Sequence, residues 1–584
     1  MSLPTNVIDR DDGNGVTTFI YGKAIASAEE AVNLGPYKAI VDGTVINVPY
    51  HLFRQRWRHR KNTVQIIRTP KQIVDGRFMF PLGDIGVPPY EVTWLPYAGP
   101  TSFSSIVPGM GMTGERPDLG LITDVSAHFM RTGNPTGLLA WADAASSFPM
   151  YYMDEATGRP ISLQTYPKAN NYWLEGRQGE PWMRVVDFSP YAPGIEMTTN
   201  HWPEMSYMAY VATGDLGYLE DLQYAANYAV FCDAYYSSAE NGAVLGIGET
   251  RFIAWGLRNL AMARRATKDA EDRGVLPDHC HPSSYWLALL TQSRVLLEDK
   301  YMKAADRQLS HSISGTDIYP GTDSQAYGPW QMDYLLCVFA FCVLVGLDDF
   351  KQLYTWAFGN AVWRSNGTSG WPVAWCPYYL PSGTFKTNGE LWAWFSNTSE
   401  VSAERRDALN ADQYNGGHMA DGSMGNYCNS TRAVLCMGVY LQDIGAIDLK
   451  ATYPELETCY ANFDRMVRNN GTVSPRTSYV RDPSKAPGEI VPLPDPKPIP
   501  QPPQPQEPPM AKTLDDVQNE VHQTTGVIAS AIALINGLRQ KLADAISGQD
   551  TAANQAKVQA IIDELDKGQN DLAAAVAANT PVAN

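Results

Sequence analysis

The sequence predicts a mainly α-helical protein in which a large body and a small helical tail are joined by a proline-rich linker. Proline occupies nearly every second position through much of the stretch from Pro492 to Pro509, a register that favours an extended polyproline II rod. From about Gly114 onward, apolar residues recur at intervals of three and four, as helices require. With 44% hydrophobic and 11% aromatic residues among 584, the chain can bury a large core.

Residues 1–112 have a strand-like pattern and are predicted to form a β-rich N-terminal domain. Runs of β-branched and aromatic residues, separated by Gly, Pro and Asp, mark the expected strands. These runs are Thr17–Tyr21, Lys38–Val48, Thr63–Arg68 and Tyr90–Leu95.

A basic stripe is expected within this domain, which is unusual in a chain of formal charge −17. If the segment is a strand, alternation places four arginines on one side of it: Arg54, Arg56, Arg58 and Arg60. The stripe docks either on the acidic body of the same chain or on a neighbouring subunit. The negative net charge argues against general nucleic-acid binding.

Helical hairpins are predicted between residues 113 and 480. Ala127–Asn134 leads into a second helical stretch, Ala209–Asp215 leads into another, and a looser copy begins at Phe341. Each first helix ends on a Gly suited to the left-handed conformation, and an Asp or Asn in the turn can cap the next helix. The irregular spacing of the copies suits a barrel of paired helices with long loops between them.

Three motifs in this region carry a resemblance to a known family. They are GERPDLG from Gly114, DEATGRP from Asp154, and GETR from Gly248 running into AWGLR at Ala254. Together they resemble the (α/α)6-toroid proteins related to six-hairpin glycosidases. The resemblance implies an inner ring of helices around a cleft that binds a sugar chain in enzymatic relatives. The expected fold is therefore mainly α, with an (α/α)6 toroid over 113–480.

The linker, residues 481–510, separates the toroid from an expected helical hairpin over 511–584. A polyproline II rod from Pro492 to Pro509, roughly 18 residues, would span on the order of 55 Å. Such a reach suits a domain held away from an assembly.

The tail contains no aromatic residue and no cysteine and carries two amphipathic helical patterns. It is similar to small helical proteins found in the virions of tailed bacteriophages. Heptad-like apolar positions such as Val517, Ile528 and Ile535 require a partner helix. A single hairpin of this size buries too little surface to be stable alone, so we expect docking on other virion subunits or homo-oligomerisation.

Two carboxylates are the leading candidates for catalysis in the toroid. Hydrolysis of a sugar chain commonly uses one carboxyl group as general acid and a second as nucleophile or base. Glu249 and Asp333 each lie beside an expected helix start, close to aromatic and polar residues. Alternatively, Glu249 caps a helix and pairs with Arg251, and Asp333 caps the helix through Leu335.

The expected sugar-binding residues flank these carboxylates or belong to aromatic-rich stretches. Sugar rings expose C–H faces that pack on Trp and Tyr, although a large helical body also needs aromatic residues in its core. His201 and Trp202, close to Glu204, form one expected subsite. The full set is Arg251, Trp255, Trp330, His201, Trp202, Asp118, Trp371 and Trp375.

No cofactor and no metal site are expected. Asp278-His279-Cys280-His281 contains three metal-capable residue types, but adjacent loop residues rarely converge on one ion, and no second pair follows at ligand spacing. The sequence has neither a Gly-rich phosphate loop nor a Gly-x-Ser-x-Gly motif. The eight cysteines are scattered without the spacing of a disulfide scaffold, so we expect free buried thiols.

These observations lead us to expect a bacteriophage virion structural or appendage protein that is assembled in the host cytoplasm and recognises a host surface glycan. The alternative is an active glycoside hydrolase or polysaccharide lyase. The start, Met1–Asn6, lacks the features of a secretory signal, and no segment has the length of a membrane span. The structural role requires the tail, whereas the enzymatic role requires the carboxylates.

Overall fold

The computed structural model divides the chain into two compact units, Met1–Asp495 and Pro496–Asn584. The described residues all belong to the first unit. They are 6–11, 16–21, 37–41, 44–48, 54–59, 65–83, 118–146, 160, 162, 203–233, 250–303, 326–366, 380–381, 387, 390, 393, 428–470, 473, 475–485 and 487. The tail positions Val517, Ile528 and Ile535 lie outside these residues, as does Arg60.

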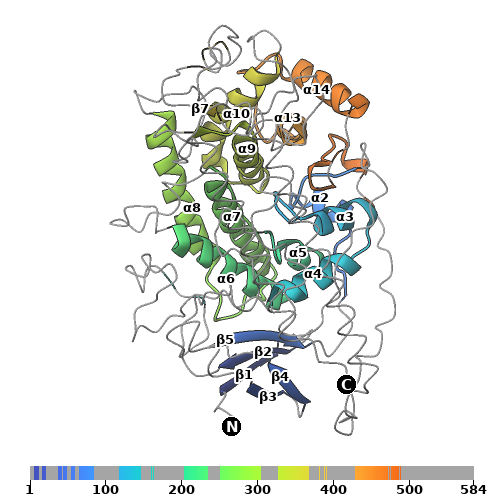
Figure 1. Ribbon diagram of the computed structural model, residues 1–584, viewed down its shortest axis with the longest axis vertical. Coiled ribbons are helices and arrows are strands. Elements are labelled where there is room, and N and C mark those ends of the chain that lie inside the picture. The colour runs from blue at the N-terminus through green and yellow to red at the C-terminus, as the bar shows by residue number, and fades with distance from the viewer. Residues whose placement is uncertain are drawn as a thin grey trace, which may run out of the picture. The chain divides into compact units, whose positions relative to one another are not determined.

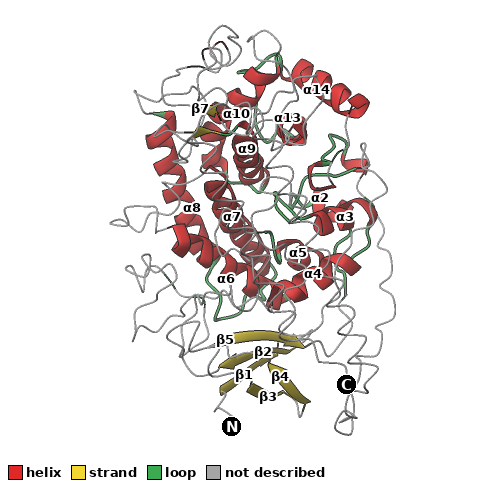
Figure 2. Ribbon diagram, viewed as in Figure 1, coloured by secondary structure: helices red, strands yellow, loops and turns green. Residues whose placement is uncertain are grey.

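The described part of the chain is mainly α-helical, as the sequence predicts (Figure 1, Figure 2). Its longer helices are α2 (Pro70–Asp75), α3 (Asp124–Thr132), α4 (Thr136–Ser146), α5 (Tyr207–Thr213), α6 (Leu216–Asp233), α7 (Thr250–Asp272), α8 (Ser283–Leu297), α9 (Pro329–Leu344), α10 (Lys351–Ser365), α13 (Cys428–Asp443) and α14 (Leu456–Asn470). Short helical turns are η4 (Glu298–Met302), η5 (Asp348–Phe350), η6 (Pro475–Thr477) and η7 (Pro483–Lys485).

The strands near the N-terminus pair in an antiparallel manner. One sheet has the order β1-β2-β5, with Thr17 of β2 opposite Arg58 of β5, and β3 pairs with β4. Because Arg54, Arg56 and Arg58 alternate along β5, these positions share one face of the strand. The bounds are β1 (Asn6–Asp11), β2 (Val16–Tyr21), β3 (Tyr37–Val41), β4 (Thr44–Val48), β5 (Arg54–His59), β6 (Ala326–Tyr327) and β7 (Leu380–Pro381).

The helices form consecutive hairpins with sharp turns. Helix α3 ends at Gly133, whose φ is 74°, and α5 ends at Gly214, whose φ is 69°. In the first turn Asn134 Oδ1 accepts the backbone N–H of Thr136 at 3.0 Å, and in the second Asp215 Oδ1 accepts that of Gly217 at 3.0 Å. Left-handed glycine followed by a capping side chain is the turn chemistry expected from the sequence.

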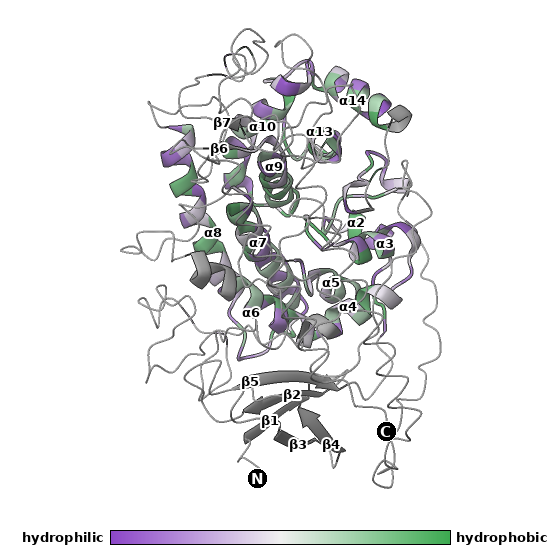
Figure 3. Ribbon diagram, in the orientation of Figure 1, coloured by the Kyte–Doolittle hydropathy of each residue, from purple (hydrophilic) through white to green (hydrophobic). Residues whose placement is uncertain are grey.

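Among the described residues, the hairpins are α3–α4, α5–α6, α7–α8, α9–α10 and α13–α14. We call the first helix of each pair an inner helix and the second an outer helix. Every residue of α5 and α9 is buried, whereas α8 exposes Leu287 and Val295. Figure 3 shows the same contrast: α9 is predominantly hydrophobic, and α14 alternates between polar and apolar faces.

The inner helices α7 and α9 run parallel to each other. At the start of α7, the backbone N–H of Arg251 donates to Gln331 Oε1 near the start of α9, at 3.3 Å. Farther along, Arg264 Nη1 donates to the carbonyl oxygen of Val345 just beyond the end of α9, at 3.2 Å. The two contacts keep α7 and α9 in one register.

Each outer helix runs antiparallel to its inner helix. Arg432, near the start of α13, pairs with Asp464 in the second half of α14. In the α9–α10 hairpin, Arg364 near the end of α10 pairs with Asp333 near the start of α9. The inner helices therefore begin at one end of the body, which we call the loop end; it is defined by Asp124, Tyr207, Thr250, Pro329 and Cys428.

Two segments far apart in the sequence meet to complete the body. Leu82 and Tyr479 form an antiparallel bridge, flanked by hydrogen bonds from Gly83 N to Ser478 O and from Val480 N to Pro81 O, both 3.0 Å. Residues 65–83 thus contribute to the helical core, although the sequence assigns them to the β-rich domain.

The predicted strand Thr63–Arg68 is not formed at residues 65–68, and helix α2 follows. Thr69 and Gln72 make a reciprocal capping box at its start, with Pro70 in the first helical turn. This combination nucleates a helix. None of the described helices is long and apolar enough to cross a membrane.

Replacing Gly214 and Gly346 with alanine tests the importance of the tight turns. Both glycines have positive φ, 69° and 81°, but a Cβ at Gly214 would lie 2.6 Å from Ile67 Cδ1, whereas one at Gly346 meets nothing within 4 Å. We expect G346A to lose about 1–2 kcal/mol through backbone strain alone. G214A should lose about 1 kcal/mol more through overpacking. Urea unfolding monitored by tryptophan fluorescence measures both variants. Equal midpoints for G214A and G346A would contradict the tight packing of the turn at Gly214.

Candidate functional site

The connections between the hairpins differ sharply in length at the two ends of the body. Within hairpins they are short: 133–135, 214–215, 273–282, 345–350 and 444–455. The segments that lead into each inner helix, and so arrive at the loop end, are mostly far longer: 76–123, 147–206, 234–249, 303–328 and 366–427. Long connections carried by a rigid scaffold are where binding and catalytic residues concentrate. The loop end is therefore the candidate functional site.

Several predicted site residues belong to these long connections by sequence. Glu249 immediately precedes α7, and Trp371 and Trp375 belong to the segment before α13. His201 and Trp202 precede α5. All five lie outside the described residues.

Asp333 is buried inside the body and neutralised by an arginine. Its side chain has no exposed surface and forms an ion pair with Arg364 of α10, which is also buried. Thr431 of α13 donates its hydroxyl to Asp333 Oδ2 at 2.5 Å. Arg364 is held in turn by Asn360 Oδ1, 2.9 Å from Nε. The cluster joins α9, α10 and α13 beneath the loop end.

The electrostatics of this cluster indicate a structural role for Asp333. Burial raises the pKa of its carboxyl group, and Arg364 and Thr431 oppose that rise. Asp333 does not cap α9 either, because the N-cap residue of this helix is Gly328 and no side chain makes a capping hydrogen bond there. A carboxylate with no exposed surface contacts no substrate in this arrangement.

Glu204 is a second buried carboxylate, on the segment that enters α5. It accepts hydrogen bonds from Ser126 Oγ at 3.0 Å and from the backbone N–H of Met208 at 3.2 Å. Its carbonyl oxygen accepts Trp141 Nε1 at 3.0 Å. Burial raises the pKa of Glu204, whereas these hydrogen bonds and nearby Arg258 lower it. Glu204 thereby ties the first two hairpins together.

Arg258 of α7 supplies the positive charge at this point. It is completely buried, donates through Nη1 to the carbonyl oxygen of Gly120 at 2.6 Å, and lies 4.8 Å from the ring centre of Trp255. Burial lowers its pKa, and the carboxylates of Glu204 and Asp118 oppose that effect. Asp118, a predicted sugar-binding residue, is therefore buried beside an arginine.

Three other predicted sugar-binding residues come together around Tyr334. The rings of Trp255 and Trp330 lie 5.0 and 5.5 Å from the Tyr334 ring, and both tryptophans are fully buried. Arg251 lies 5.5 Å from the Trp330 ring and is itself buried. The structure brings these three residues together as a packed stack of aromatic rings and arginine.

Several partners of the buried carboxylates were not predicted from the sequence. Arg476 donates its backbone N–H to Asp124 Oδ1 at 3.0 Å, which secures the start of α3. Arg364 and Thr431 were missed in the same way. The available signal was an arginine inside an otherwise apolar helical pattern, because such a residue requires a buried counterion.

No metal centre is found among the residues that the structure describes. In the segment that contains three metal-capable residue types, His279 Nε2 lies 3.0 Å from Glu220 Oε1, and His281 stacks on Tyr285. The cysteines with described side chains are buried and form no disulfide: Cys280, Cys337, Cys342, Cys428, Cys436 and Cys459.

Comparisons with protein-family models, with curated proteins and with solved structures gave no match.

The Asp333–Arg364 pair yields a prediction about stability. Asp333→Asn retains the side-chain volume but leaves Arg364 without its counterion, so we expect a loss of about 3–5 kcal/mol. The double variant D333L/R364M removes both charges and should lose much less. As a control, Lys71→Ala breaks the exposed Lys71–Asp75 pair and should cost no more than about 1 kcal/mol. Calorimetric unfolding checks all three; a D333N variant as stable as the native chain would contradict the structural role.

Proposed function

We propose that the chain is a structural or appendage protein of a bacteriophage virion. In this proposal residues 113–480 form an (α/α)6 toroid, preceded by a β-rich domain, displayed on the proline-rich linker and anchored to the particle by the C-terminal helices. The toroid recognises a host surface glycan. The virion is its site of action, with assembly in the host cytoplasm.

The parallel inner helices and antiparallel outer helices support the toroid part of the proposal. In a closed ring of hairpins, each inner helix contacts the next, as α7 and α9 do through Arg251 and Gln331. Residues 65–83, which precede this region in the sequence, meet its C-terminal end through the bridge between Leu82 and Tyr479. Such a meeting is what a ring requires where it closes.

The observation that best supports the structural role is the burial of the candidate carboxylates. Asp333 and Asp118, the candidate acidic residues that the structure describes, are both buried beside arginines. In such a body the buried charged residues join helices to one another, which suits a role in binding and display. The long connections at the loop end then carry recognition, and they include the predicted aromatic residues Trp371 and Trp375.

The tail supplies the anchor in this proposal. Val517, Ile528 and Ile535 form the apolar stripe that docks on other virion subunits, and copies of the chain associate through it. The basic stripe at Arg54, Arg56 and Arg58 is a second contact, made with a neighbouring subunit or with the body itself.

An enzymatic role is favoured by one feature of the sequence, the place of Glu249 directly before α7. It directly precedes Thr250, where α7 begins beside the start of α9. A carboxylate at that place belongs to the loop end, where a glycoside hydrolase or polysaccharide lyase would hold its substrate. Arg251 is the neighbouring residue whose positive charge would influence the ionisation of Glu249.

Truncation of the tail tests the structural proposal. A chain that ends at Asp495 retains the first compact unit, so its helical body should unfold at the native temperature. It should fail to incorporate into particles and should be monomeric in light scattering, because the docking stripe is missing.

A milder variant separates docking from simple loss of mass. Serine at Val517, Ile528 and Ile535 should abolish incorporation, since each exchange removes an apolar contact. The matched control places serine at Gln518, Thr524 and Asn536 and should incorporate normally. Normal incorporation of the chain that ends at Asp495 would overturn the proposal.

The Glu249→Gln variant tests the enzymatic alternative. Under the structural proposal, host surface polysaccharide incubated with the native chain or with E249Q keeps its length in size-exclusion chromatography. Asp272→Asn, at an exposed end of α7, is the matched control. Chain shortening that E249Q abolishes and D272N retains would establish the enzyme instead.

A further inference from the structure

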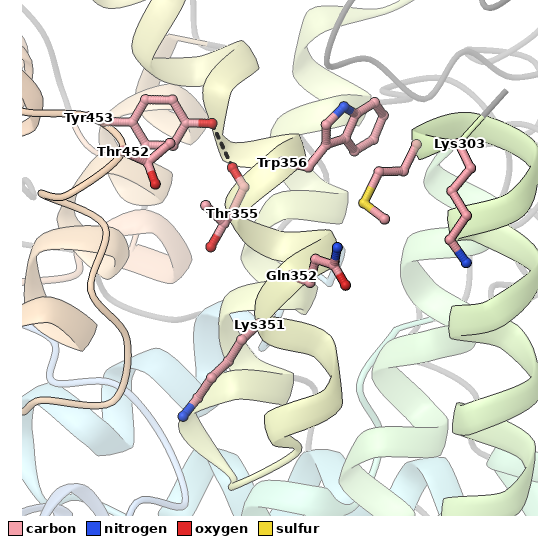
Figure 4. A pocket seen from close by; sticks show the side chains of 8 residues that line it. Lys303, Lys351, Gln352, Thr355, Trp356, Thr452 and Tyr453 are labelled. Carbon is pink, nitrogen blue, oxygen red and sulfur yellow. Dashed lines mark hydrogen bonds between the residues drawn. The ribbon is translucent and has the colours of Figure 1, made fainter. Parts of the chain in front are cut away.

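An open groove crosses the surface of α10, away from the buried clusters beneath the loop end. It has a volume of about 640 Å3 and is bordered by η4 on one side and by the segment before α14 on the other. Pockets of this size commonly hold small ligands. Its lining residues are Met302, Lys303, Lys351, Gln352, Thr355, Trp356, Thr452 and Tyr453 (Figure 4).

One part of the groove offers an apolar platform. Trp356 and Met302 are partly buried, pack against the hydrophobic core and line the groove. Figure 4 shows Trp356 on the side of α10 that faces Lys303. A half-buried indole presents a flat apolar face, and Trp is suited to surfaces at which one part of a ligand is apolar and another is polar.

The other lining groups are hydrogen-bonding side chains. Gln352 and Thr452 are exposed at the rim. The wall beside them is fixed, because Tyr453 donates its hydroxyl to the carbonyl oxygen of Thr355 at 2.7 Å (Figure 4). An amide and hydroxyl groups both donate and accept, which matches a ligand that carries many hydroxyl groups.

The charges around the groove balance. Lys351 pairs with Asp348 at 2.9 Å, and Lys303 pairs with Asp299 at 2.9 Å. The remaining neighbour of Lys303 is Glu298, which is held by Arg294 at 2.5 Å. Lys303 and Lys351, the charged residues that line the groove, are thus each paired with a carboxylate outside it. With both ammonium groups paired, the groove offers an anion little free charge and suits an uncharged ligand.

The backbone at one edge of the groove is unusual. Residues Glu298–Met302 form a π-helical turn, in which Lys303 N–H donates to the carbonyl oxygen of Glu298 at 2.7 Å. Single π-helical turns occur frequently at functional sites. Here the turn ends at Met302 and Lys303, which both line the groove.

We propose that the groove between η4, α10 and Thr452–Tyr453 binds a neutral saccharide unit. The apolar face of the sugar ring stacks on Trp356, and its hydroxyl groups bond to Gln352, Thr452 and the lysine ammonium groups. The site is separate from the loop end. It rests on the glycan recognition in the proposed function but not on attachment to the particle.

Binding of the fluorescently labelled full chain to an array of neutral gluco-, manno- and galacto-oligosaccharides tests this inference. We expect binding to at least one of them, quantified by calorimetry, with little change between about 0.05 and 0.5 M salt because no charge is recognised. Trp356→Ala should weaken binding roughly tenfold or more. Gln352→Ala, at an exposed position, should weaken it about threefold.

The matched control is Trp363→Ala on the same helix. Trp363 is partly buried but does not line the groove, so this variant should bind within about twofold of the native chain. Native affinity in W356A and Q352A would contradict saccharide binding in the groove, but it would not contradict glycan recognition by the loop end. Absence of binding to every neutral probe, binding only to an anionic polysaccharide, or binding only to a polyproline peptide would each overturn the neutral-saccharide assignment.

Discussion

The chain reverses direction within a few residues after most inner helices, and the arrangement of the body depends on this reversal. At Gly133 and Gly214 the backbone has φ of 74° and 69°, a conformation that costs other residues roughly 1–2 kcal/mol. Where the turn is this short, the outer helix must run back along its own inner helix. Successive inner helices are then parallel, and the long connections all arrive at the loop end.

Buried charge sets the relative position of the helices in this arrangement. Arg364 contacts residues on three helices, since it pairs with Asp333, bonds to Asn360 and reaches Thr431 Oγ1 at 3.2 Å. A buried ion pair adds little net stability, because desolvation offsets most of the Coulomb attraction. The pair instead disfavours any wrong register of the helices, because a shifted helix would leave a buried charge without its partner. The same pairing removes Asp333 from any contact with a substrate.

Features that depend on neighbouring residues could be predicted from the sequence. The hairpin turns at Gly133 and Gly214 follow from a glycine and the next Asn or Asp, which act over two or three positions. The burial of the thiols follows from apolar patterns around Cys337 and Cys342. Helix α2 was missed although its signal is local: the capping box of Thr69 and Gln72 directly follows the expected strand Thr63–Arg68.

Features that depend on distant residues could not be predicted. Asp333 lies 31 positions before Arg364 and 98 before Thr431, so no local pattern reveals that its charge is neutralised. Trp255 and Trp330 illustrate the same limit, because an aromatic residue beside a polar one has the same sequence signature in a cleft and in a core. The groove at Trp356 escaped notice for the converse reason: its lining comes from three separate segments.

In our proposal the helical body is displayed and the tail anchors it. A cryo-electron microscopy map of the intact particle that carries this chain tests that claim most directly. The account predicts that density for residues 511–584 contacts other subunits, with the helical body outside the particle beyond a thin linker. A map in which the body is enclosed by other subunits and residues 511–584 contact none of them would contradict it.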